Sequence, residues 1–277
     1  MLKKLVCLMV MVLVGLTLNA KSYNRIIVLE PAIVETIYML GGEDRIVAIA
    51  HSTMTGIEPM EKTSKLPSVG TILKPSFEQV ISHKPDLVIV NMMNNEIIDN
   101  LKRFNIEYVE LKLDSFDNFL ESILKVGSYV NKEKEAKELY NTSIQRLEVV
   151  KNALKEKPLN LKGTFIYNAS PLMTFGSGTV QSEILLSLGV EDIGRSVVGQ
   201  RPILSPEYIV KTNPDFLIGI LGVQSRTDLI KANEYLLRTK AGRGNNIHVL
   251  STNRIMRMSP YIIDEIEEIY RFLSNIN

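Results

Sequence analysis

Short apolar runs alternate with amphipathic stretches along the first half of the chain. The runs have the length of buried strands and lie at residues 25–29, 45–50, 86–90 and 108–111. Two helical patterns lie between them, at residues 32–40 and 76–82. Gly41 directly follows the first of these patterns, where a glycine commonly ends a helix. Strands that alternate with helices predict a mainly parallel sheet that is covered on both faces.

A longer pattern follows at residues 132–157. Apolar side chains recur at steps of three and four from Ala136 to Leu154, with Lys and Glu between them, which predicts an amphipathic helix. Pro158 ends this helix, and its length is roughly 39 Å at a rise of ~1.5 Å per residue. The strand and helix patterns then resume, with strands at 164–168, 216–221 and 247–250 and a helix at 180–188. The pattern predicts an N-terminal lobe (21–131), a connecting helix (132–158) and a C-terminal lobe (159–277).

The two predicted lobes carry matching sequence blocks. Residues 76–89 (SFEQVISHKPDLVI) align without a gap on residues 205–218 (SPEYIVKTNPDFLI), at an offset of 129. A second block aligns residues 35–44 with residues 183–192, at an offset of 148. The difference between the offsets places about 19 extra residues in the first lobe, within residues 51–74. The repeat indicates two lobes of related build that are joined by one helix.

Each copy of the first block begins with residues that are typical of a helix N-terminus. Ser76 and Ser205 stand where a side chain caps the helix N-terminus. Glu78 and Glu207 then fall in the first helical turn, where a carboxylate complements the helix dipole. This local role alone is one explanation of the two glutamates.

The first twenty residues have the layout of a secretory signal peptide. Lys3 and Lys4 precede an apolar run at residues 5–16, and Ala20 is a small residue just before the polar chain begins. The run is shorter than the ~20 residues that a membrane-spanning helix needs. We therefore expect export to the periplasm with cleavage after about Ala20. A lipoprotein would need a cysteine at the cleavage point, whereas Cys7 precedes most of the apolar run, so we expect no lipid anchor.

Composition narrows the class of protein. Apolar residues make up 45% of the chain and charged residues 23%, which excludes disorder and indicates a packed core. The formal charge is +1, and it becomes −1 without the two lysines of the signal peptide, so nucleic-acid binding is not expected. Cys7 is the sole cysteine, and no cluster of His, Asp and Glu has the spacing of a metal site. We therefore expect neither a disulfide nor a bound Zn²⁺ or Mn²⁺.

At this point the sequence resembles a known family. Four segments carry the resemblance, namely residues 25–50, 66–90 (LPSVGTILKPSFEQVISHKPDLVIV), the helix at 132–157, and residues 204–220 (LSPEYIVKTNPDFLIGI). In this order, after a signal peptide, they resemble the class III, or helical-backbone, substrate-binding proteins of ABC importers. That group includes siderophore-, haem- and vitamin B12-binding proteins. The resemblance implies two Rossmann-like α/β lobes, one rigid backbone helix and a ligand cleft between the lobes.

The resemblance also implies partners. Members of the family dock on an inner-membrane permease and its ATPase through one glutamate in each lobe, and these positions carry over to Glu78 and Glu207. The repeat agrees with this assignment, since helix-dipole complementarity does not require a glutamate in both lobes. We expect a monomer that holds no cofactor of its own and carries a small-molecule metal chelate.

Candidate ligand-binding residues follow the predicted strand ends, because ligands of open α/β sheets bind at the carboxyl ends of the strands. The segments around Arg201 and Arg257 match cleft-lining segments of the family. The full set of candidates is His51, Met54, Met92, Met93, Met173, Arg201, Arg226, Arg257 and Tyr261. The three arginines would form a cationic rim on the C-terminal lobe that suits an anionic chelate. The methionines suit a flat apolar ligand, although ordinary core filling explains them as well.

The ligand is the least determined feature. Vitamin B12 binders of the family tend to place an aromatic residue where Arg201 stands, and this chain has no Trp. Haem-binding members often place a tyrosine where Thr71 stands, although His51 could replace it as a ligand. We therefore rank a ferric siderophore first, followed by haem, a nickel or cobalt chelate, and cobalamin. A secreted enzyme on the same scaffold is the alternative class, but no G-x-S-x-G, G-x-G-x-x-G or P-loop motif is present.

Overall fold

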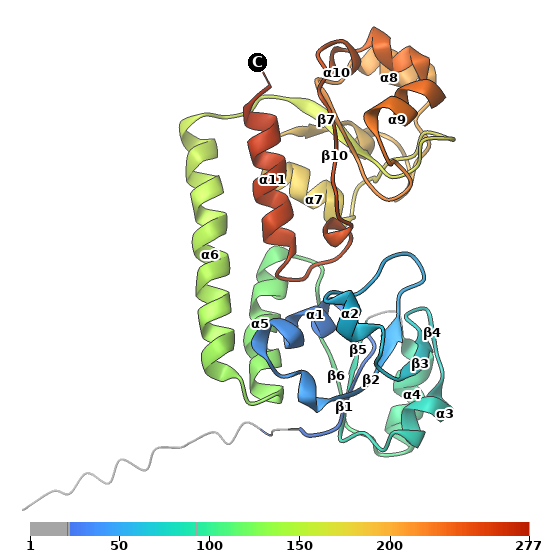
Figure 1. Cartoon of the computed structure of the whole chain (residues 1–277), viewed down its shortest axis with the longest axis vertical. Coiled ribbons are helices and arrows are strands. Elements are labelled where there is room, and N and C mark those ends of the chain that lie inside the picture. The colour runs from blue at the N-terminus through green and yellow to red at the C-terminus, as the bar shows by residue number, and fades with distance from the viewer. Residues whose placement is uncertain (1–20, 22, 92–93, 277) are drawn as a thin grey trace, which may run out of the picture.

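The computed structural model describes residues 21, 23–91 and 94–276. The expectations for residues 1–20, Met92 and Met93 lie outside these residues. Two sheets occupy the lower and upper halves of the molecule, and a long helix runs beside both (Figure 1). Within this described part of the chain, none of the helices combines the length and the apolar character that a membrane crossing requires.

The N-terminal sheet has six strands in the order β4-β3-β2-β1-β5-β6. The strands are β1 (Ile26–Val28), β2 (Ile46–His51), β3 (Ser68–Thr71), β4 (Lys74–Pro75), β5 (Leu87–Val90) and β6 (Tyr108–Glu110). All neighbouring strands are parallel except β3 and β4, which form an antiparallel pair. The four apolar runs of the sequence are thus β1, β2, β5 and β6. The first three of these strands are buried or largely buried, whereas β6 is a partly exposed edge strand.

The C-terminal sheet repeats this order. Its four strands are β7 (Lys162–Ile166), β8 (Glu191–Asp192), β9 (Phe216–Gly219) and β10 (Ile247–Val249). They are all parallel and lie in the order β8-β7-β9-β10, which corresponds strand for strand to β2-β1-β5-β6. The repeat seen in the sequence is therefore a repeat of sheet topology. The expected α/β architecture with mainly parallel sheets is confirmed.

The extra residues of the first lobe build the edge of its sheet. The stretch between the aligned blocks forms α2 (Met60–Thr63), β3 and β4, whereas the C-terminal sheet, as far as the chain is described, ends at β8. Residues 52–59, which lead from β2 into α2, therefore form a loop that belongs to the N-terminal lobe. This loop contributes to the site described below.

The repeated residues have the same structural role in both lobes. Asp86 accepts hydrogen bonds from the backbone N–H groups of Asn24 and Arg25, at 2.8 and 2.9 Å, just before β1. Asp215 accepts one from the N–H of Lys162, at 3.0 Å, at the start of β7. The Pro-Asp pair thus ties the end of one helix to the first strand of its lobe.

Helix ends also agree with the sequence. The hydroxyl oxygens of Ser76 and Ser205 cap α3 (Phe77–Ser82) and α8 (Pro206–Thr212), as predicted. Gly41 and Gly189 end α1 (Pro31–Leu40) and its repeat counterpart α7 (Val180–Ser187), and both have a φ of 69°. That left-handed conformation favours glycine, which explains why both copies of the block keep it.

A layer of helices joins the lobes. The predicted connecting helix is α6 (Glu133–Glu156), and it lies beside α5 (Phe116–Tyr129) and α11 (Ile262–Ser274) (Figure 1). Arg146 of α6 makes a bidentate pair with Glu267 of α11, with both N···O distances at 2.7 Å, and a third bond of 2.7 Å to Asp264. One apolar core runs from the N-terminal lobe through this layer into the C-terminal lobe. Neither α5 nor α11 is among the helices predicted from the sequence.

The remaining elements lie between these strands and helices along the chain. They are α4 (Asn95–Arg103), α9 (Arg226–Ala232), α10 (Lys240–Arg243) and the 3-10 turns η1 (Glu43–Arg45), η2 (Ile193–Ser196), η3 (Glu234–Arg238) and η4 (Arg254–Met256). The turn η4 follows β10 and precedes α11, and it lies close to the N-terminal lobe (Figure 1).

Candidate functional site

The segments that follow the strands of the two sheets meet between the lobes. Glu35 lies in α1, which follows β1, and Thr55 lies in the loop that follows β2. Arg257 follows β10 and η4 in the other lobe, yet it contacts both of these residues. The carboxyl ends of the two parallel sheets are therefore turned toward the same interlobe region, which is where an open α/β fold binds ligands.

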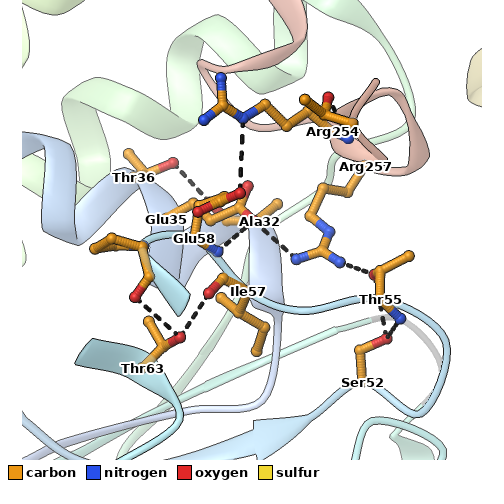
Figure 2. Close-up of polar contacts among 12 residues, drawn as sticks. Ala32, Glu35, Thr36, Ser52, Thr55, Ile57, Glu58, Thr63, Arg254 and Arg257 are labelled. Carbon is orange, nitrogen blue, oxygen red and sulfur yellow. Dashed lines mark hydrogen bonds and ion pairs between the residues drawn. The ribbon is translucent and has the colours of Figure 1, made fainter. Parts of the chain in front are cut away.

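An ion pair joins the lobes at this place (Figure 2). Arg257 Nη1 donates to Glu35 Oε1 at 2.8 Å, and the two side chains are only 10% and 2% exposed. Arg257 Nη2 also donates to the hydroxyl oxygen of Thr55. Burial raises the pKa of the Glu35 carboxyl above its ordinary value, and the positive charge of Arg257 opposes that shift.

Hydrogen bonds hold the loop at residues 52–59 in place. Ser52 Oγ accepts hydrogen bonds from the N–H groups of Met54 and Thr55, at 3.3 and 3.2 Å. Thr63 of α2 donates its hydroxyl to the carbonyl of Ile57 at 2.5 Å. The backbone N–H of Glu58 donates to Glu35 Oε1 at 3.1 Å, so the same oxygen accepts hydrogen bonds from the loop and from Arg257 (Figure 2).

A second arginine of the C-terminal lobe reaches toward this loop. Arg254 Nε lies 3.9 Å from Glu58 Oε1, and Arg254 Nη1 lies 3.8 Å from Asp264 Oδ2. Its guanidinium carbon stands 4.4 Å from the ring centroid of Tyr261. A pocket of about 260 Å³ lies at this boundary, lined by Glu35 and Glu58 from one lobe and by Arg254 and Arg257 from the other.

A different cluster lies just past the end of β7. The Tyr167 hydroxyl is 3.5 Å from the sulfur of Met173, and its ring centroid is 4.8 Å from that of Phe175. The guanidinium of Arg201, which is exposed, stands 5.8 Å from the centroid of the Tyr167 ring. We call Tyr167, Met173 and Arg201 the β7 cluster. It combines an aromatic face, a polarisable sulfur and a cation.

The candidates predicted from the sequence include Met173 and Arg201 of this cluster but not Tyr167. The predicted strand at 164–168 contained Tyr167, whereas β7 ends at Ile166, so the strand-end rule applies to Tyr167 only in the observed structure. The candidates also did not include Glu35, Thr55 or Glu58. No periodicity or motif links these residues to Arg257, which is about two hundred positions away in the chain.

The three candidate arginines have different partners in the structure. Arg257 is paired with Glu35, and Arg226 Nη2 donates to the carbonyl of Gly242 at 3.0 Å inside the C-terminal lobe. Arg201 alone of the three is exposed beside an aromatic ring. The guanidinium groups of Arg257 and Arg226 thus donate to oxygen atoms of the protein itself, whereas within the described part of the chain that of Arg201 does not.

The remaining candidates lie as follows. His51 is the last residue of β2 and is partly buried, and Met54 lies in the loop at 52–59 with 54% of its surface exposed. Tyr261 is partly buried at the start of α11, against Arg254. Across residues 21, 23–91 and 94–276, no three His, Cys, Asp or Glu side chains are grouped closely enough to hold a metal ion.

The two glutamates of the repeat are exposed. Glu78 lies in the first turn of α3 and Glu207 in the first turn of α8. Each helix begins at the capping serine, so the two carboxylates occupy equivalent positions in equivalent helices. The topology of the repeat therefore presents the same charged group on each lobe.

Similar proteins place this fold in a family. The periplasmic binding protein family matches residues 26–253. The petrobactin-binding protein YclQ of Bacillus subtilis is 25% identical over 246 residues, which cover 84% of this chain and 76% of the relative. The vitamin B12-binding protein of Yersinia pestis is 25% identical over 221 residues, which cover 78% of this chain and 76% of the relative.

Solved structures agree on the fold. The vitamin B12-binding protein BtuF of Vibrio cholerae has a TM-score of 0.77 at 18% identity, over 91% of this chain and 97% of its own. The structure of YclQ has a TM-score of 0.75 at 22% identity, over 92% of this chain and 93% of its own. Because the family match spans most of the chain and the two-lobed fold is shared, this chain belongs to the periplasmic binding protein family.

Proposed function

We propose that the protein is the substrate-binding component of an ABC importer and that it captures a metal chelate, with a ferric siderophore as its ligand. It would be exported by the signal peptide at residues 1–20, bind the chelate in the periplasm and deliver it to the permease. Family membership supports the general role, and the relatives named above bind petrobactin or vitamin B12. The relatives are binding proteins rather than enzymes.

The observation that carries the choice of ligand is the β7 cluster. An aromatic ring and a thioether suit a flat ligand with apolar surface, and an exposed guanidinium suits negatively charged oxygens. A ferric chelate built from catecholate or carboxylate groups offers both. Haem combines a flat apolar ring with carboxylates as well, so it is the second candidate, ahead of a nickel or cobalt chelate and cobalamin.

A binding panel tests this proposal. We would titrate the chain from residue 21 with a ferric catecholate, a ferric hydroxamate, haemin, nickel–histidine and cyanocobalamin, following tyrosine fluorescence and thermal shift. We expect saturable one-to-one binding of a ferric chelate without turnover. Binding of another panel member instead would identify that member as the ligand. Conversion of any member to a product would favour an enzyme.

The β7 cluster makes a specific prediction within that panel. Replacing Arg201 with Gln should weaken the bound chelate by roughly 10- to 100-fold, because charge-assisted hydrogen bonds are worth ~1.5–3 kcal/mol. Tyr167→Ala should also weaken it, through loss of the aromatic face. Arg103→Gln, which removes an exposed arginine of α4 in the other lobe, is the matched control and should change nothing. An unchanged dissociation constant for Arg201→Gln would remove this cluster from the site.

A further inference from the structure

The boundary between the lobes has charged groups on one side and open grooves on another. On the side of α5 and α7, a groove of about 370 Å³ separates Ser115 and Phe116 of the N-terminal lobe from Glu183 and Met258 of the C-terminal lobe. A second groove, of about 530 Å³, runs between α5, α6 and α11. Open grooves at a boundary leave room for one lobe to rock against the other, because tight packing is what resists such motion.

At the contact between Glu35 and Arg257, which Figure 2 shows, the lobes are joined by charged groups that have little contact with water. Arg257 makes two hydrogen bonds across the boundary, and Glu35 receives one of them together with the N–H of Glu58. An ion pair this buried is screened little by solvent or salt. It also has two points of attachment on the N-terminal lobe, so it restricts rotation as well as separation.

We propose that Glu35 and Arg257 form an interlobe strut that sets the separation of the lobes before a ligand arrives. Arg257 is then a positioning residue whose charge is committed to Glu35, rather than a group that binds an anionic ligand. Removing either partner would let the lobes sample other orientations about α6. The consequence for ligand affinity rests on the proposed function, whereas the consequence for lobe separation does not.

The repeat offers a natural comparison for this pair. Glu183 aligns with Glu35, and it too forms an ion pair with an arginine, Arg195 Nη1, at 2.9 Å. That partner lies in the same lobe as Glu183. The two glutamates thus share position and chemistry, but only Glu35 is bonded across the boundary by its arginine. Glu183→Gln is therefore a matched control for Glu35→Gln.

The distance between the lobes can be measured directly. The chain from residue 21 contains no cysteine, so Lys65→Cys and Lys231→Cys would place one spin label on an exposed site of each lobe. Pulsed electron paramagnetic resonance without ligand should give one narrow distance distribution. Arg257→Ala and Glu35→Gln should each broaden it, the double variant should be no broader than the single ones, and Glu183→Gln should leave it unchanged.

Two further measurements keep the outcome decisive. Arg257→Lys retains the charge but cannot reproduce both contacts, so it should broaden the distribution partly even if Arg257→Ala folds poorly. The dissociation constant of the chelate should rise about tenfold in Arg257→Ala and Glu35→Gln alike, as expected when the competent orientation falls to about a tenth of the population.

A distribution that stays narrow in every variant would overturn the strut. Weaker binding in Arg257→Ala alone, with a narrow distribution, would show that Arg257 binds the ligand. Failure of the whole panel to bind would refute the proposed ligand. The distance measurement alone would then show whether the strut holds the lobes.

Discussion

Alanine at both Glu78 and Glu207 should abolish uptake of the chelate while its dissociation constant stays unchanged. The two carboxylates lie in the first turns of α3 and α8, which are equivalent helices of the two lobes, and both are exposed. A permease that presents arginines around a two-fold axis would meet one glutamate from each lobe. Each charge-assisted pair is worth ~1.5–3 kcal/mol, so losing both should weaken docking by roughly 10²-fold or more. Transport of the radiolabelled chelate into cells that express the cognate importer is the measurement.

The controls for docking come from the same structural setting. Glu96 and Asp228 are exposed acidic residues in the first turns of α4 and α9, one in each lobe, outside the repeated block. Alanine at both should leave uptake intact if the positions of the repeat matter rather than acidic helix starts in general. Each single variant, Glu78→Ala or Glu207→Ala, should retain part of the uptake. Full uptake by the double variant would refute the docking assignment and leave the two glutamates as ordinary helix-start residues.

Replacing Asp192 with Ala should lower the free energy of unfolding by about 3–5 kcal/mol, the largest stability effect that we expect from a single substitution. Its carboxylate is buried and accepts hydrogen bonds from Thr164 Oγ1 at 2.8 Å, Ser182 Oγ at 2.6 Å and the N–H of Gly194 at 3.0 Å. Burial raises the pKa of this carboxyl, and the hydrogen bonds oppose that shift. Alanine would leave buried donors from β7, α7 and η2 without their acceptor. Urea unfolding followed by circular dichroism would measure the loss.

The repeat again supplies the comparison. Asp44 aligns with Asp192, but its side chain is 75% exposed and only 3.5 Å from Arg45, so Asp44→Ala should change stability by less than about 0.5 kcal/mol. Asp192→Asn retains one acceptor and should cost less than Asp192→Ala. Equal losses at Asp44 and Asp192 would mean that burial does not distinguish the two positions, contrary to the structure.

Much of the fold could be predicted from local sequence. The strands β1, β2 and β5 are apolar runs because both faces of a parallel sheet are covered, and Gly41 and Gly189 mark helix ends because of their left-handed φ. The aligned Pro-Asp blocks correctly indicated two lobes of one topology. Helices α5 and α11 were missed although their patterns were readable, for α11 buries Ile262, Ile266, Ile269 and Leu273 on one face. The strand β8 has only two residues, so no apolar run could reveal it.

The sequence did not reveal which side chains contact each other. It marked Arg201, Arg226 and Arg257 as three similar residues in loops after strands, which suggested one cationic rim. Only the tertiary structure decided that Arg257 is bonded to Glu35, that Arg226 donates to a carbonyl in its own lobe, and that Arg201 lies over Tyr167. By itself the sequence determined the family, the two-lobed build and the equivalent glutamates, because these depend on periodicity and on repeats along the chain. The contacts between the lobes depend on how two sheets face each other. Glu35 and Arg257 can meet only after the helices α5, α6 and α11 have joined the lobes, so no local pattern reveals their contact.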